Sequence, residues 1–152
     1  MTTASASPAG PRDITDRDDV AELVVAFYRQ AATDDLLGPV FEAARVDWAA
    51  HIVTLTDFWS WQLLGIPGYE GNPLRAHEPA HRRTPFAPKH YQRWLELFIE
   101  TVDERFDGPI ATTAKGRALR MARALERLLR DEHADGGAPI EVKFGAAMSS
   151  RC

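Results

Sequence analysis

The sequence has a single cysteine, Cys152, at its last position. One thiol can neither close a disulfide within the chain nor build a cysteine-rich metal site. The chain also lacks an excess of positive charge, because 18 Lys and Arg stand against 22 Asp and Glu and the formal net charge is −4. A basic surface that grips a nucleic-acid backbone is therefore not expected, and we predict no nucleic-acid partner.

Long apolar runs are missing as well. The longest, such as residues 58–66, are too short to span a bilayer, and residues 1–13 lack the apolar centre of a signal peptide. We therefore expect a cytoplasmic protein with no membrane partner. Of the 152 residues, 45% are hydrophobic and 26% are charged, which is ordinary for one globular domain.

Composition suggests where that domain begins and ends. Residues 1–13 are small and polar and are predicted to form a disordered extension, and residues 135–152 a flexible tail. Residues 14–134 between them show helical periodicity almost throughout. No run alternates convincingly as a strand, so the predicted fold class is all-α.

Local signals place the helix ends. Thr15 with Asp18 resembles a capping box at the first start, and Gly65 is expected to end the third helix. A short helix over 73–77 should stop before Pro79, because an interior proline removes a helical hydrogen bond. The remaining helices are predicted from near residue 15, after residue 39, and over 46–64, 88–106 and 109–133.

Four polar-capable side chains fall on otherwise apolar helical faces: Tyr28, His51, His77 and Trp94. Burying such groups costs free energy unless each finds a partner. Taken singly, each is more simply explained as a core residue with a satisfied hydrogen bond. Their recurrence on the inward faces of several helices is less easily explained in that way.

His77 and His81 stand four residues apart with Pro79 between them. Zinc would need a third ligand, which does not stand nearby in sequence, and the expected break at Pro79 would keep the two rings off one face. No serine or acid partner is evident for a nucleophilic triad. His81 is expected at the surface or at the edge of a cofactor, and His90 and His133 in solvent.

A haem asks for one axial histidine, a flat apolar slot, a few cations for its propionates and donors over the distal face. His77 can be the axial ligand to the iron of haem b. Aromatic and aliphatic residues can wall the slot: Phe41, Leu55, Phe58, Trp59, Leu74, Phe86 and Tyr91. Cations that can reach the propionates are Arg75, Arg82, Arg83 and His81. The distal donors can be Tyr28, His51 and Trp94.

Four motifs together are similar to a known family. They are "FYRQAATDDLLGPVF" (27–41), "DWAAHIVTLTDFWSWQLLG" (47–65), "YEGNPLRAH" (69–77) and "FAPKHYQRWLELF" (86–98). In order and approximate spacing they resemble the truncated haemoglobins of the third group, over about residues 15–134. The paired-glycine motifs of the first two groups are missing, as is general in the third.

The resemblance implies a truncated globin fold, a 2-on-2 helical sandwich around a haem pocket. By position, His77 matches the proximal ligand and Tyr28 the tyrosine that hydrogen-bonds iron-bound oxygen. Trp94 matches the distal tryptophan, and His51 the distal histidine that can gate the pocket. Leu55 matches the apolar residue one turn further on, over the haem.

The function expected on this basis is binding of O2, NO or CO at a His-ligated iron. A polar distal pocket suits redox chemistry, scavenging or sensing better than bulk delivery. Enzyme status stays open: nitric oxide dioxygenation or peroxidase-like activity would need an external electron donor. A monomer or weak dimer is expected. The alternative is a cofactor-free helical interaction module.

Overall fold

The computed structural model describes residues 10–135, apart from the side chains at positions 74, 83 and 131–135. Within this range the chain forms six α-helices and no strand, as predicted. Their bounds are α1 Arg17–Thr33, α2 Gly38–Ala44, α3 Trp48–Leu64, α4 Pro73–Arg83, α5 Pro88–Arg105 and α6 Pro109–Asp135. None of these helices is long and apolar enough to cross a membrane.

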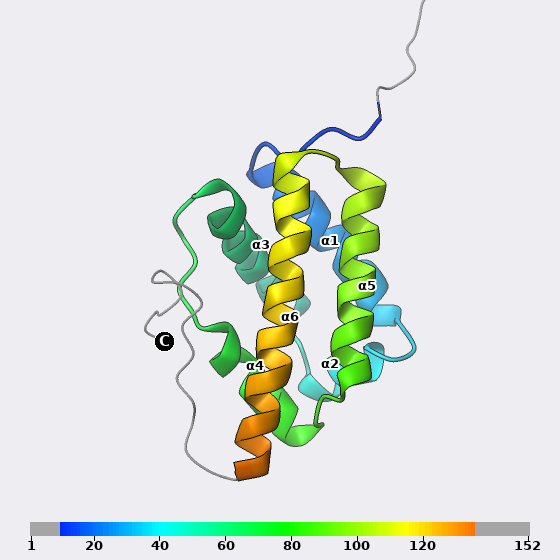
Figure 1. Cartoon of the computed structure of the whole chain (residues 1–152), viewed down its shortest axis with the longest axis vertical. Helices are drawn as coiled ribbons and strands as arrows, with labels where there is room; N and C mark the ends of the chain where they lie inside the picture. Colours follow the sequence, from blue (N-terminus) through cyan, green and yellow to red (C-terminus); the bar gives the residue numbers. More distant parts are fainter. Residues whose placement is uncertain (1–9, 136–152) are drawn as a thin grey trace, which may run out of the picture.

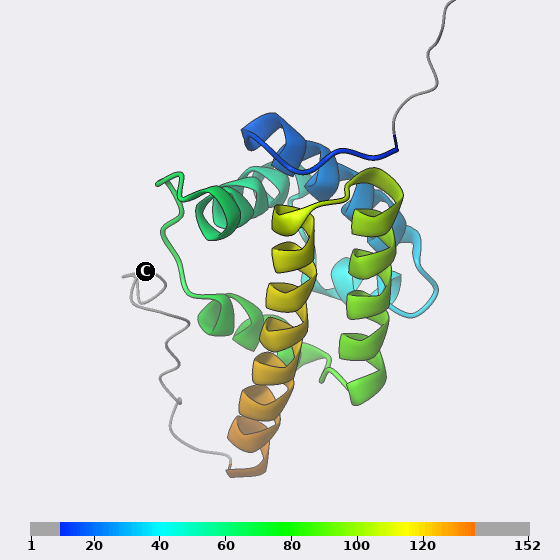
Figure 2. The same ribbon diagram turned by 45° about the horizontal axis from the view of Figure 1, so that its top comes forward.

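The helices form two layers (Figure 1). α5 and α6 lie side by side in front of α1 and α3, and α1 packs on both α3 and α5. The turned view in Figure 2 shows α4 closing the lower side of the molecule beneath α3, next to α6. This arrangement agrees with the expected two-over-two helical sandwich.

An aromatic stack joins the layers. The ring of Phe98 on α5 stacks on Trp59 of α3, with centroids 4.9 Å apart, and on Trp94 of its own helix at 5.4 Å. Phe27 of α1 meets Phe98 edge-on at 5.4 Å. Phe27, Trp59 and Phe98 are all almost fully buried, and such aromatic pairs contribute about 0.5–1.5 kcal/mol each beyond the area they bury.

Helix ends follow the sequence signals with one shift. Asp16, rather than Thr15, caps α1, and its carboxylate accepts the Asp19 N–H at 2.9 Å. Asp47 caps α3, and Gly65 ends it with φ 70°, a left-handed conformation that glycine adopts without a steric penalty.

The prediction that the helix stops before Pro79 was wrong, because α4 continues to Arg83. A proline at this position removes only its own N–H bond. Backbone bonds on both sides remain, from Ala76 N–H to the Asn72 carbonyl and from Thr84 N–H to the Ala80 carbonyl, each 2.9 Å long. His77 and His81 therefore share one helix after all.

The segment before α1 anchors the N-terminus of α6. The Asp13 carboxylate accepts the N–H groups of Ile110 and Ala111, at 3.0 and 2.8 Å, from nearly one hundred residues away in sequence. Arg12 pairs with the buried Asp19. The predicted disorder of 1–13 stays a prediction for 1–9, which lie outside the described residues, but Arg12 and Asp13 are already part of the fold.

We expect Asp13→Ala to lower the free energy of unfolding by about 1 kcal/mol, because it removes a side-chain cap from α6. Urea denaturation followed by circular dichroism measures this difference. Asp107→Ala is the matched control, since Asp107 is a neighbouring exposed acid, and its variant should stay close to wild type. Equal stability of the two variants would remove Asp13 from the list of caps.

Acid should destabilise the protein partly through Asp19. The Arg12 guanidinium and the Thr15 N–H and hydroxyl hold the pKa of Asp19 well below its usual value, against the opposing effect of burial. A carboxylate with a lowered folded-state pKa stabilises the fold above about pH 4, its unfolded pKa, and this contribution is lost on acidification. Asp19→Asn should therefore flatten the rise in stability with pH, whereas Asp18→Asn at an exposed neighbouring position should not.

Candidate functional site

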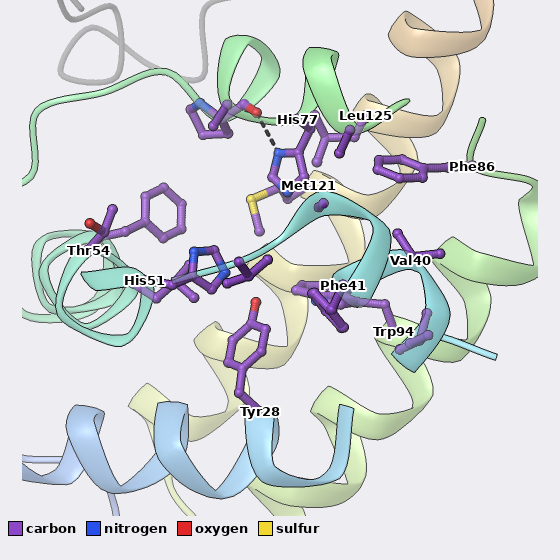
Figure 3. Close-up of a pocket in the computed structure, with 18 of the residues that line it drawn as sticks. Tyr28, Val40, Phe41, His51, Thr54, His77, Phe86, Trp94, Met121 and Leu125 are labelled. Atoms are coloured by element: carbon purple, nitrogen blue, oxygen red, sulfur yellow. Dashed lines mark hydrogen bonds between the residues drawn. The ribbon is translucent and has the colours of Figure 1, made fainter. Parts of the chain in front are cut away.

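A cavity of about 610 Å³ lies between the two layers and α4. This volume is in the range of small-molecule and cofactor pockets. The four polar-capable side chains singled out in the sequence all line it and come from different helices: Tyr28 from α1, His51 from α3, His77 from α4 and Trp94 from α5. Figure 3 shows Tyr28 and His77 approaching the cavity from opposite sides, with His51 between them.

His77 is held in one tautomer. Its Nδ1 lies 2.6 Å from the carbonyl oxygen of Pro73, one turn earlier in α4. A carbonyl can only accept, so Nδ1 carries the proton and Nε2 keeps its lone pair. Burial lowers the pKa of His77, although the bond to Pro73 partly opposes this. The cavity wall therefore presents a neutral, oriented imidazole nitrogen.

The opposite wall carries the distal group. The rings of Tyr28 and His51 meet edge-on with centroids 5.4 Å apart, and Phe41 and Trp48 each lie 5.8 Å from the Tyr28 ring. Burial raises the pKa of Tyr28 to about 12, and a hydrogen bond with Trp94 opposes that rise. A phenol with so high a pKa is protonated at neutral pH and can donate.

His51 is also neutral at physiological pH. Its pKa is lowered by burial and, secondarily, by the nearby His77. Two imidazoles that share one weakly solvated cavity disfavour a second positive charge there. His51 can thus donate one hydrogen bond and accept another, but contributes no permanent charge.

An ion pair joins the end of α1 to α5 next to Trp94. Asp34, at the end of α1, accepts the Arg93 Nε–H at 2.8 Å and the backbone N–H groups of Leu36 and Leu37. Arg93 directly precedes Trp94. The ion pair therefore holds the helix of Tyr28 against the helix of Trp94.

Most predicted wall residues line the cavity, and these are Phe41, Leu55, Phe58, Trp59, Phe86 and Tyr91. Arg75 is exposed on α4 and is not among the lining residues. Arg82 pairs with Glu78 at 3.5 Å. The side chains of Leu74 and Arg83 fall outside the described part, so their predicted roles stay predictions.

Two histidines are placed differently from expectation. His81 is buried, not at the surface, and its Nδ1 accepts the Phe86 N–H at 3.0 Å beside the Phe86 ring. His90 lines the cavity half-buried, with its Nδ1 accepting the Ala87 N–H at 2.8 Å. Both rings thus accept backbone N–H groups of the segment that connects α4 to α5. The side chain of His133 lies outside the described residues.

Several lining residues were not predicted for the site, among them Val40, Thr54, Met121 and Leu125. Met121 and Leu125 belong to the inward stripe of the last helix, which was recognised, but their distance in sequence hid their position beside His77 (Figure 3). Thr54 follows His51 by three residues, so helical spacing could have found it.

A multi-ligand metal site is not supported. Among the described residues no three His, Cys, Asp or Glu side chains are grouped to hold a metal ion. The Pro79 argument against zinc fails with the continuous helix, but the missing third ligand remains decisive. One imidazole nitrogen facing a largely apolar cavity instead suits a flat cofactor with a single axial ligand.

Known proteins resemble this chain in sequence and in structure. No family model matches the chain. A group 3 truncated haemoglobin from Campylobacter jejuni is 28% identical over 117 residues, which cover 74% of this chain and 90% of that protein. The crystal structure of group III truncated haemoglobin from the same organism has a TM-score of 0.69 and 27% identity, and covers 78% of this chain and 94% of that chain. The resemblance seen in the motifs is thus confirmed: the chain is similar to group III truncated haemoglobins in sequence and in structure, and it has the truncated globin fold.

Proposed function

We propose that the protein binds haem b in this cavity and takes up O2 and other diatomic ligands there. The observation that carries the proposal is the forced tautomer of His77, whose Nε2 lone pair faces a cavity of about 610 Å³. An axial iron ligand needs this arrangement, and a bond from the other ring nitrogen to a backbone carbonyl fixes the ring and raises its basicity.

The residues around the cavity would have different roles in binding haem and its ligand. Phe86, Met121 and Leu125 lie around His77 and provide apolar surface for a flat cofactor on that side (Figure 3). Haem, when bound, would supply an iron atom that takes up a diatomic molecule and shifts charge onto it. Tyr28 and Trp94 would then donate hydrogen bonds toward that charge, each contributing about 1.5–3 kcal/mol in a dry site.

Such strong retention of a bound diatomic ligand favours redox chemistry, scavenging or sensing over bulk oxygen delivery. Nitric oxide dioxygenation and peroxidase-like activity both fit a cavity with polar donors, and either would use an external electron donor. Neutral His51 can accept a proton or donate a hydrogen bond near a bound ligand, whereas Tyr28, with its raised pKa, can donate a hydrogen bond.

The alternative, a cofactor-free interaction module, has less support. Within the described residues Val53, at 56% exposure, is the only exposed large hydrophobic side chain. A docking surface for a partner helix requires a contiguous apolar patch, which one valine does not form.

The purified protein should show a Soret band that shifts under carbon monoxide. His77→Gly should lose or alter this spectrum, and added imidazole should restore it by occupying the space of the missing ring. His81→Ala is the matched control, because His81 lies four residues further along α4 and does not line the cavity. A colourless protein that rejects haemin contradicts the proposed function, and an unaltered His77→Gly spectrum contradicts His77 as ligand.

Oxygen should dissociate faster from Tyr28→Phe than from the wild type, by about tenfold for each 1.4 kcal/mol of hydrogen-bond energy lost. Stopped-flow mixing with excess carbon monoxide measures the dissociation rate. Ser60→Ala provides the control, since it removes a buried hydroxyl on α3 that does not line the cavity. A wild-type rate in Tyr28→Phe would exclude that hydroxyl from ligand retention.

A further inference from the structure

A second, smaller cavity of about 280 Å³ lies on the outer side of α2. It shares two wall residues with the main cavity, Phe41 and Val46. Ala32 contributes from α1, and the charged side chains of Glu42 and Arg45 stand exposed around it. The two cavities are therefore neighbours separated by side chains, and the smaller one adjoins solvent.

Trp48 lies between the smaller cavity and the rings of Tyr28 and His51, which line the main cavity. It lines the smaller cavity but not the main one, and its ring lies 5.3 Å from Phe41, 5.8 Å from Tyr28 and 5.8 Å from His51. Tyr28 and His51 are the polar groups of the distal wall. Rotation of one indole would thus open a path from the smaller cavity to the place where these two side chains converge.

Helix α2 is held by half-buried side chains. None of its seven residues is fully buried and its start has no side-chain cap, and Phe41 provides its ring contacts with Tyr28 and Trp48. It ends at Arg45 with φ 53°, the one left-handed non-glycine residue in the described range. Few buried contacts and a strained end mean that local opening costs little free energy.

We propose that the smaller cavity is an entrance for small uncharged ligands to the distal half of the main cavity, with the Trp48 ring as its movable partition. The proposal rests on the proposed function, because it concerns access of diatomic gases to the cofactor site. A gas molecule fits the space, and its lack of charge lets it pass Glu42 and Arg45 and then the aromatic rings.

The association rate of carbon monoxide after flash photolysis of the haem-loaded protein tests the entrance. Trp48→Ala should raise this rate several-fold by removing the partition, and Ala32→Leu should lower it by filling the smaller cavity from α1. Trp61→Ala is the matched control: it removes the same side chain from the same helix, but Trp61 stacks on Tyr69 and lines neither cavity.

Faster association in Trp48→Ala, slower association in Ala32→Leu and a wild-type rate in Trp61→Ala support the proposal. A wild-type rate in Ala32→Leu overturns it, whatever Trp48→Ala does, since ligands would then enter elsewhere, for example past His51. Ala32→Leu also keeps the test valid if Trp48→Ala fails to fold.

Xenon gives a readout independent of ligand kinetics. Crystals of the wild type under xenon pressure should show an atom between Ala32, Phe41 and Trp48, and crystals of Ala32→Leu should not. No xenon at this place in the wild type overturns the proposal. A protein that takes up no haem contradicts the proposed function, whereas a haem-loaded protein with unchanged rates contradicts the entrance alone.

Discussion

The stack of Trp59, Phe98 and Trp94 is the contact on which the rest of the structure depends. It joins α3 to α5 through face-to-face rings, and Phe27 adds α1 from the edge. Tyr28 directly follows Phe27, so the ring that locks α1 into the stack also fixes the position of the next side chain. Trp94 is itself a member of the stack. The packing that holds the layers together therefore also sets the geometry of the distal donors.

The second constraint is electrostatic. Three of the polar side chains in the cavity wall are the imidazoles of His51 and His77 and the phenol of Tyr28; burial lowers the pKa of both histidines and raises that of the tyrosine, so the neutral form of each is favoured. The bond from Nδ1 to the Pro73 carbonyl fixes the tautomer of His77 before any ligand binds. Tyr28 and His51 retain freedom to donate or accept.

Local patterns foretold most of the helices, their inward faces and the four polar groups of the site, because helical period and caps are properties of neighbouring residues. Other features depend on partners far apart in sequence. The cap that Asp13 gives α6 spans nearly the whole domain, and no local signal marks it. His81 was expected at the surface or at the edge of a cofactor; its actual partner, the Phe86 N–H, becomes available only when the chain turns after α4. At Pro79 the helix continued, because the backbone bonds on both sides of the proline remain.

Some helices hold the cavity in place, and another lies where small molecules could reach it. Ion pairs hold α1 to its neighbours, from Arg17 to Asp57 on α3 at 2.6 Å and from Asp34 to Arg93 on α5 at 2.8 Å. These pairs flank the helices that carry Tyr28, His51 and Trp94. Helix α2 has no fully buried residue, although its half-buried Phe41 packs against Tyr28. Because an element with little buried area contributes little to global stability, α2 can open locally at a lower free-energy cost than α1, α3 or α5. A cavity built in this way can be dry and well ordered at its centre and still exchange small molecules with solvent.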